Sequence, residues 1–186
     1  MHDLLPITPL GQSAPITETF GAITLAENTN CALASATARL GQEDAAIKVL
    51  TKFLGTPPPA PAKISRATFD TFWMGPDQWM IIAPFDSCED LAFRLVQAAN
   101  GTLSVTEQTD AWCRFDLVGH GLSDIFELLC PVNTRAMTGQ DAQRTSIDHL
   151  GCFLLVHDAD RFSVIGPRSS AGSLHHALVT AIKAAQ

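Results

Sequence analysis

The apolar residues of this chain are spaced in two ways, one typical of helices and the other typical of strands. Apolar residues recur three and four positions apart in four segments, which predicts helices at residues 41–55, 87–99, 121–130 and 170–185. Alternation or a short apolar run predicts strands at residues 20–27, 31–40, 67–74, 79–84, 111–119, 144–158 and 161–167. Because strands and helices are mixed along the chain, the pattern favours an α+β fold with largely antiparallel sheets and helices on one face.

The segment 41–55 illustrates how a helix is recognised and where it ends. Ala46, Ile47, Leu50 and Leu54 fall on one face at helical spacing, and Gly55 is a typical terminating residue. The prolines that follow cannot continue a helix and predict a stiff, extended linker. We therefore expect this helix to be joined to the next strand by a proline-rich connection.

The segment FWMGPDQWMIIAP, residues 72–84, predicts a β-hairpin with a Gly-Pro-Asp turn between two tryptophans. Its turn, second strand, closing proline and following helix face recur later in the chain in one register without gaps. The register pairs Asp77 with Asp160, Trp79 with Phe162, Ile81 with Val164, Pro84 with Pro167, Leu91 with Leu174 and Leu95 with Leu178. The match of polar as well as apolar positions favours a real internal repeat over chance similarity.

The repeat predicts two pseudo-repeated strand-helix-hairpin-helix units of a ferredoxin-like or related split β-α-β type. We place the first α+β half at residues 20–101 and the second at 102–186, packed as one compact unit whose halves share or adjoin a sheet. Residues 1–19 are rich in proline and lack periodicity, which predicts an extended N-terminal arm. The arm is either loose or laid along a neighbouring chain, and its apolar residues Leu4, Leu5, Ile7 and Leu10 favour the second alternative.

Composition and charge narrow the classes of function. The chain has 186 residues, 46% of them hydrophobic and only 17% charged, which is typical of a well-buried globular protein or a subunit of a complex. The net charge is −7, and no cluster of lysine or arginine occurs, so nucleic-acid binding and attachment to an anionic membrane are disfavoured. The five cysteines form no C-x-x-C pair and are typical of reduced thiols, from which we expect a cytoplasmic protein.

Motifs of catalytic or metal sites are absent from the sequence. Neither a glycine-rich phosphate loop nor a G-x-S-x-G nucleophile motif occurs. Ser146, Asp148 and His149 are close in sequence, but a strand would point the first two away from the histidine, which argues against a catalytic triad. His175 and His176 are adjacent and would diverge on a helix. The residues therefore predict neither a catalytic residue nor a metal ligand in this chain.

Four polar residues are candidates for an anion site or a folate pocket. Arg144 and Arg168 lie at the ends of predicted elements, where a guanidinium could hold a carboxylate or phosphate. Ser169 follows Arg168 at a predicted helix start, which is a natural position for an anion. Asp77 completes the set as a possible pterin contact. The alternative is structural: Arg168 pairs with a local acid, a serine caps the helix, and Asp77 bonds to the turn backbone.

The three tryptophans are candidates for packing or interface residues. Trp73, Trp79 and Trp112 all lie in predicted strands, where aromatic side chains usually pack in a core or an interface. The alternative function for such residues is the wall of a cofactor pocket. The sequence alone favours packing.

Several segments together resemble the gamma subunit family of heterotetrameric sarcosine oxidase, over residues 31–183. They are residues 32–61, 72–84, 129–133, 144–157 and 161–178. The most specific motifs are W-x-G-P-D-x-W and R-S-x-x-x-S-L, formed by Trp73, Gly75, Pro76, Asp77 and Trp79, and by Arg168, Ser169, Ser173 and Leu174. Neither motif is a catalytic signature.

The resemblance implies a fold and a function. The fold would be similar to the folate-binding domain of aminomethyltransferases, and the chain would be a non-catalytic structural subunit packing on the alpha subunit, with beta and delta subunits as further partners. Such a complex demethylates sarcosine oxidatively to glycine, transfers the one-carbon unit to tetrahydrofolate and forms hydrogen peroxide. FAD, FMN, NAD, tetrahydrofolate and zinc would be held by the other subunits, and none by this chain.

Two other functions remain open at the level of sequence. One is a free-standing folate-binding or one-carbon-transfer protein of the same fold, in which Asp77, Arg144 and Arg168 would contact the pterin or the glutamate. The other is a general interaction module with no connection to sarcosine.

Overall fold

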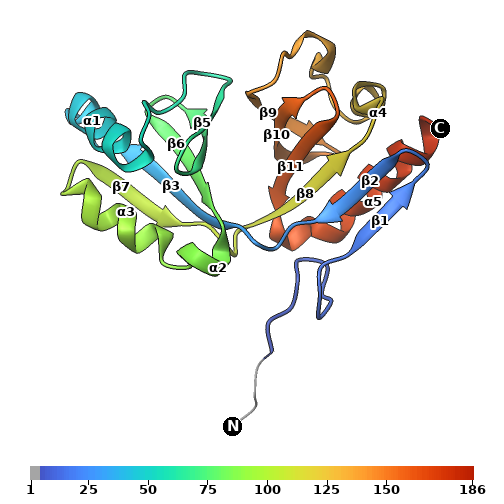
Figure 1. The fold of residues 1–186 in the computed structure, drawn as a ribbon, viewed down its shortest axis with the longest axis horizontal. Helices are drawn as coiled ribbons and strands as arrows, with labels where there is room; N and C mark the ends of the chain where they lie inside the picture. The colour runs from blue at the N-terminus through green and yellow to red at the C-terminus, as the bar shows by residue number, and fades with distance from the viewer. Residues whose placement is uncertain (1–4) are drawn as a thin grey trace. The chain divides into compact units, whose positions relative to one another are not determined.

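The computed structural model describes residues 5–186, which form two compact units, each built on its own antiparallel sheet (Figure 1). Unit 2 is Asn30–Thr109, and unit 1 joins the described residues through Thr29 to Asp110–Gln186. Both units mix strands and helices, which confirms the predicted α+β class. Within residues 5–186, no helix combines the length and apolar character needed to cross a membrane.

Unit 2 has the order of elements expected for a split β-α-β fold. Its elements are β3 (Ala32–Ala38), α1 (Glu43–Leu54), β4 (Ile64–Arg66), β5 (Asp70–Gly75), β6 (Gln78–Ala83), α2 (Phe85–Cys88), α3 (Leu91–Ala99) and β7 (Leu103–Glu107). The strands are ordered β4-β5-β6-β3-β7 in the sheet. One face of this sheet packs with α1 and α3 around a core that includes Leu50, Leu54, Trp79, Ile81 and Leu95.

Helix α1 shows how local sequence fixes an element in unit 2. It ends at Gly55, whose left-handed φ of 78° lets its N–H bond to the Thr51 carbonyl oxygen and close the helix. Ala46, Leu50 and Leu54 are buried, as the spacing predicts. Ile47 is an exception, because 39% of its surface is exposed. It lies at the edge of the apolar face and lines a surface pocket instead of the core.

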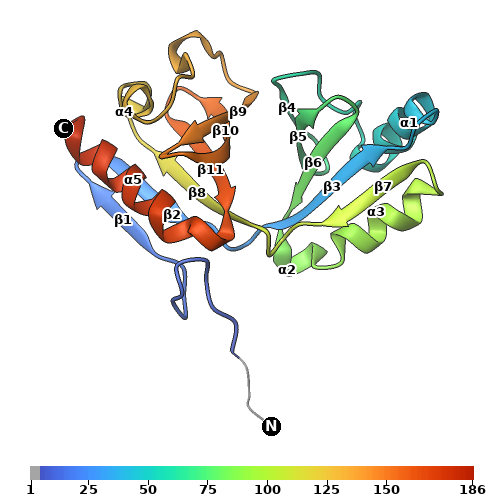
Figure 2. The ribbon, with the colours of Figure 1, turned by 180° about the vertical axis from the view of Figure 1, so that it is seen from behind.

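Unit 1 repeats this plan with a different strand at one position. Its elements are β1 (Thr17–Phe20), β2 (Ile23–Glu27), β8 (Trp112–Val118), α4 (Leu122–Leu129), η1 (Thr134–Ala136), β9 (Asp141–Ile147), β10 (Leu150–Asp158), β11 (Arg161–Pro167), η2 (Arg168–Ser170) and α5 (Ala171–Ala184). The sheet order is β1-β2-β8-β11-β10-β9. Helices α4 and α5 lie together on one face of it, as the two opposite views show (Figures 1 and 2).

The internal repeat predicted from the sequence is confirmed element by element. Asp77 and Asp160 both lie in the turn before a central strand, β6 in unit 2 and β11 in unit 1. Pro84 and Pro167 both precede the helical segment that follows. The apolar helix positions also correspond, because Leu91, Leu95, Leu174 and Leu178 are all buried. The repeat therefore extends from backbone topology to individual core positions.

The single strand predicted at residues 144–158 is wrong, because this segment is a hairpin. Strands β9 and β10 pair in antiparallel register around Asp148 and His149, with Ile147 opposite Leu150. Asp148 and His149 have φ values of 47° and 65°, as the two central residues of a type I′ turn require. The turn contains no glycine, proline or asparagine, so none of the strongest turn signals separates the two strands in the sequence.

The division into units differs from the predicted boundaries at residues 101 and 102. Strand β7 (Leu103–Glu107) completes the sheet of unit 2, whereas β1 and β2 join the sheet of unit 1 through pairing of β2 with β8. In unit 2, the strand that pairs with β3 on the side away from β6 is β7, from the C-terminal end of the unit. In unit 1, the corresponding strand beside β8 is β2, which comes from the N-terminal part of the chain. Pairing between segments far apart in sequence leaves no local signal.

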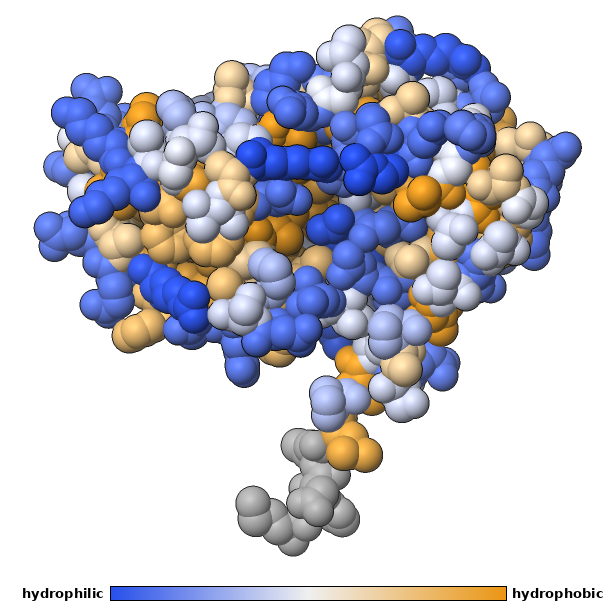
Figure 3. Space-filling model, in the orientation of Figure 1, coloured by the Kyte–Doolittle hydropathy of each residue, from blue (hydrophilic) through white to orange (hydrophobic). Residues whose placement is uncertain are grey.

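The predicted N-terminal arm is attached to unit 1 over its described part, and residues 1–4 lie outside that part. The buried Glu27 carboxylate accepts hydrogen bonds from the backbone N–H groups of Leu10, at 2.9 Å, and Ile16, at 3.3 Å. Thr8 is buried, while Leu5 and Ile7 are 83% and 62% exposed. On the face of the molecule drawn in Figure 3, apolar residues are interspersed with hydrophilic ones.

Candidate functional site

The four candidate anion or folate residues lie in separate places. Asp77 belongs to the turn between β5 and β6 in unit 2, whereas the other three belong to unit 1. Arg144 lies on β9, the edge strand of its sheet, and is exposed. Arg168 and Ser169 form the short helix η2 after β11. Arg144 does not line the pocket that Arg168 and Ser169 line, so unit 1 does not gather the three residues into one site.

Arg168 holds the N-terminal arm in place. Its Nη2 donates a hydrogen bond to the Ile7 carbonyl oxygen at 2.8 Å, and its backbone N–H donates to the Ala111 carbonyl oxygen at 3.0 Å. Asp110 lies 3.8 Å from Nη1, at the limit of an ion pair. The adjoining pocket, of about 590 Å³, is lined by the arm on one side and by Arg168, Ser169 and Asp110 on the other. The local acid and backbone contacts match the structural alternative considered for this arginine.

The tryptophans lie in or beside the two cores. Trp79 is buried in the core of unit 2, and its indole N–H donates to the Pro59 carbonyl oxygen at 3.0 Å. Trp73 lies directly opposite Trp79 in the β5–β6 register and is half-buried. Trp112 is half-buried in unit 1, with its ring centroid 5.5 Å from that of Phe153.

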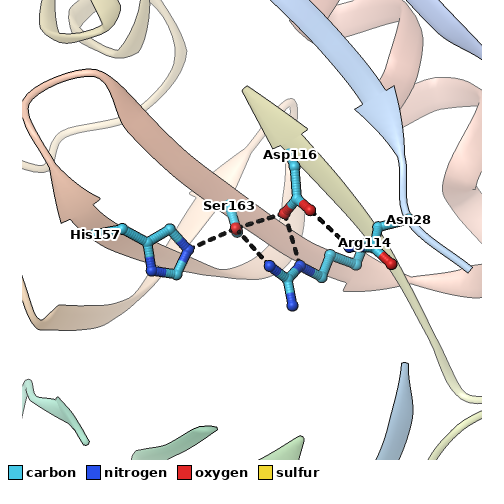
Figure 4. A network of polar contacts seen from close by, with 5 residues as sticks. All are labelled: Asn28, Arg114, Asp116, His157 and Ser163. Atoms are coloured by element: carbon cyan, nitrogen blue, oxygen red, sulfur yellow. Dashed lines mark hydrogen bonds and ion pairs between the residues drawn. The ribbon is translucent and has the colours of Figure 1, made fainter. Parts of the chain in front are cut away.

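A polar network on the sheet of unit 1 escaped the sequence analysis (Figure 4). Arg114 and Asp116 lie on β8, Ser163 on β11, His157 on β10, and Asn28 just after β2. The alternation of β8 sends Cys113, Phe115 and Leu117 into the core with the helices, and therefore sends Arg114 and Asp116 to the opposite face. The same alternation could have identified these two residues from the sequence.

The contacts in the network converge on the Asp116 carboxylate. Its Oδ1 accepts from the Ser163 hydroxyl at 2.5 Å and from Arg114 Nε at 2.7 Å, and its Oδ2 accepts from Asn28 Nδ2 at 2.7 Å (Figure 4). Arg114 Nη2 also donates to Ser163 Oγ at 3.2 Å. The two carboxylate oxygens thus accept from three side chains, with the charged donor on Oδ1 and a neutral amide on Oδ2.

Counting protons fixes the role of His157. Ser163 has one hydroxyl proton, which it donates to Asp116, so the 2.7 Å contact from His157 Nε2 requires a proton on that nitrogen. In a neutral imidazole, Nδ1 is then an acceptor. This atom is buried and has no hydrogen-bond partner among the described residues. Of the five residues in the network, no other buried side-chain nitrogen or oxygen lacks a hydrogen-bond partner.

The network does not have the geometry of a nucleophilic site. In a Ser-His-Asp triad the carboxylate orients the histidine, but here Asp116 bonds to Ser163 itself. Ser163 is only 1% exposed, so its hydroxyl is not accessible to a substrate. The arrangement is therefore suited to fixing the relative positions of β2, β8, β10 and β11.

Two of the buried thiols, Cys113 and Cys152, are held in the unreactive protonated form. Burial raises the pKa of Cys113 to about 11, and the thiol lies 3.4 Å from the Gly166 carbonyl oxygen. Burial likewise raises the pKa of Cys152 to about 11. A thiol is a nucleophile or metal ligand only as the thiolate, which both sites disfavour. Over residues 5–186, no three His, Cys, Asp or Glu side chains gather closely enough to hold a metal ion.

Comparison with known proteins establishes the fold. No family model and no curated protein sequence matches this chain. Its structure is similar to a chain of heterotetrameric sarcosine oxidase from Corynebacterium sp. U-96, at 19% identity and a TM-score of 0.71, over 87% of this chain and 84% of that one. It is also similar to glycine cleavage system aminomethyltransferase T from Bartonella henselae, at 12% identity and a TM-score of 0.71.

The two similarities differ in extent. The match to the aminomethyltransferase covers 95% of this chain but only 57% of that enzyme, so this chain spans little more than half of its length. The match to the sarcosine oxidase chain is nearly complete in both directions. This chain therefore has the fold shared by aminomethyltransferase T and a sarcosine oxidase chain, as the resemblance seen in its sequence implied.

Proposed function

We propose that this chain is the gamma subunit of a heterotetrameric sarcosine oxidase, a structural subunit that packs on the alpha subunit. The observation that carries the proposal is the reciprocal coverage of 87% and 84% with a chain of that enzyme, at a TM-score of 0.71. The complex would demethylate sarcosine to glycine, transfer the one-carbon unit to tetrahydrofolate and form hydrogen peroxide. FAD, FMN, NAD, tetrahydrofolate and zinc would be bound by the other subunits.

The side chains of the chain are consistent with a subunit that contributes packing. The serine of its polar network around Asp116 is buried, and burial holds the thiols of Cys113 and Cys152 protonated. Leu5 and Ile7 of the arm expose apolar side chains, which a larger partner could cover. The arm is anchored through Glu27 and Arg168, so it would present these residues from a fixed base.

Co-expression tests the proposal directly. The chain is produced with the large flavoprotein subunits and the small subunit from the same genome, and separately by itself. We expect it to elute with the flavin absorbance in a complex that releases hydrogen peroxide from sarcosine, and to be colourless and inactive alone. Elution of the chain apart from the flavoprotein, with full oxidase activity remaining in the other subunits, contradicts the proposal.

The similarity to aminomethyltransferase T favours one alternative, a free-standing folate-binding or one-carbon-transfer protein. The residues suggested for such a pocket fit poorly, because Arg168 is committed to the arm and Arg144, on the edge strand β9, does not line the pocket beside Arg168. Calorimetric titration of the isolated chain with tetrahydrofolate separates the two functions. Absence of heat at millimolar ligand rejects the alternative, whereas a saturating isotherm with one site rejects the purely structural function.

A further inference from the structure

A pocket of about 420 Å³ in unit 2 lies where the proline-rich connection passes the β5–β6 hairpin. Its walls are formed by residues 57–61, Ile47, Trp73, Pro76, Asp77 and Trp79. The volume is within the range of small-molecule sites, which are mostly apolar with a few placed polar groups. Nothing in the proposed function of the complex uses this pocket.

The aromatic walls of the pocket are held rigidly. Trp73 and Trp79 are direct cross-strand partners, so their indoles project from the same face of the sheet. The hydrogen bond from Trp79 Nε1 to the Pro59 carbonyl oxygen fixes both the ring and the loop that forms the opposite wall. Prolines restrict that loop further. The pocket is therefore pre-formed, with two tryptophans and several prolines among its lining residues.

Asp77 supplies the only charge in the lining. Its side chain is exposed, and no cation pairs with it among residues 5–186. Its φ of 53° is fixed by the turn, and its carbonyl oxygen accepts a hydrogen bond from the Ala38 N–H at 2.9 Å. A carboxylate at an aromatic pocket favours a cation and disfavours an anion.

The other copy of the repeat provides an internal comparison. Asp160, which corresponds to Asp77, has a partner, because its Oδ1 lies 2.9 Å from His120 Nδ1. Phe162, which corresponds to Trp79, packs against Phe126 of α4 with ring centroids 5.2 Å apart. The fold is thus stable with this position filled and its carboxylate paired. In unit 2, by contrast, the corresponding carboxylate of Asp77 borders the pocket.

We propose that this pocket binds a small organic cation, an alkylated ammonium group with an apolar body. The indole faces would contact the alkyl groups and attract the positive charge through their quadrupoles, and Asp77 would provide the counter-charge. The apolar body would lie along Ile47 and the prolines. Because no side chain in the lining is basic, carboxylate or phosphate ligands would gain no charge partner there.

Choline and its neutral carbon isostere, dimethylbutanol, are suitable probes because they share shape and differ in charge. Titration is followed by the fluorescence of a full-length Trp112→Phe chain, in which only Trp73 and Trp79 remain as reporters. We expect a saturable change with choline and binding of dimethylbutanol about tenfold weaker. Equal binding of the two probes, or a response to choline that never saturates, overturns the proposal.

Two further variants test the residues assigned to the site. Asp77→Asn keeps the shape and tolerates positive φ, and it should weaken choline binding about fivefold or more without affecting dimethylbutanol. Asp160→Asn is the matched control, because it removes the corresponding carboxylate of the other unit and should leave choline binding unchanged. Unchanged choline affinity in Asp77→Asn, with thermal unfolding as in the parent chain, refutes the assignment of the counter-charge.

Discussion

Gly119 is the position at which a single added methyl group should most damage unit 1. It follows β8 with a φ of +142°, a region that residues with a side chain rarely adopt. A Cβ built there lies 2.2 Å from the Ala22 carbonyl oxygen and 2.9 Å from Ile23 Cδ1. The first of these neighbours is backbone at the start of β2, so it cannot rotate away. Substitution by alanine must therefore displace β2 from β8.

The magnitude follows from two contributions. A side chain forced into a sparsely populated backbone region costs about 1–3 kcal/mol. Insertion of a group into a packed site costs about 1–3 kcal/mol more. We expect Gly119→Ala to lower the free energy of unfolding of unit 1 by about 2–6 kcal/mol, a large part of the stability of a typical domain.

Urea denaturation of the full chain measures this loss. Trp112 lies in the same unit as Gly119, so its fluorescence reports on unit 1 when Trp73 and Trp79 are replaced by phenylalanine. Gly151→Ala is the control, because a Cβ on this β10 residue meets no atom within 4 Å. It should change stability by no more than about 0.5 kcal/mol. Equal stability of the two variants would refute the steric reasoning.

Three other expectations follow from the structure. Because the pKa of Cys113 and of Cys152 is raised from 9.0 to about 11, unfolded thiols lose protons first as the pH rises. The contribution of the two thiols to the free energy of unfolding is therefore fully present below pH 9 and is lost between pH 9 and about 11, by about 1.4 kcal/mol per pH unit for each thiol. Cys113→Ala should halve this slope in urea titrations. Ser163→Ala removes one of the three donors to Asp116 and leaves His157 Nε2 without its hydrogen-bond partner, so it should destabilise by about 1–3 kcal/mol, whereas the exposed Ser146→Ala should have almost no effect on the urea midpoint. Hydrogen bonds and charges of Glu127 and Asp124 raise the pKa of Arg135, yet the group is exposed, so Arg135→Ala should change the melting temperature only slightly and not at all in high salt.

The parts of the fold that could be predicted from sequence are those fixed by local periodicity. Helix α5 repeats apolar residues at 171, 174, 178 and 182, and each of these residues is buried. The hairpin around Asp77 is marked by glycine and proline, which restrict the backbone strongly enough to be recognised. Local pattern also exposed the repeat, since the same turn, strand and helix face recur in order.

The parts that could not be predicted depend on partners far apart in sequence or on unusual turns. The turn at Asp148 and His149 uses two residues with side chains at positive φ, which the sequence does not mark. The polar network joins Asn28 to Asp116 and Asp116 to Ser163 across strands that only the folded sheet brings together. Periodicity indicates the face on which each residue lies but not which strand is its neighbour.

The difference between the two copies of the repeat can be traced to one aromatic position. In unit 1, Phe162 needs no hydrogen bond, so the side chain of Phe126 from a helix can pack directly on its ring. In unit 2, Trp79 has an indole N–H that requires an acceptor when buried, and the Pro59 carbonyl oxygen provides it. This bond holds the proline-rich loop against the indole. The prolines restrict the backbone of this loop, which lines the pocket together with Trp73 and Asp77.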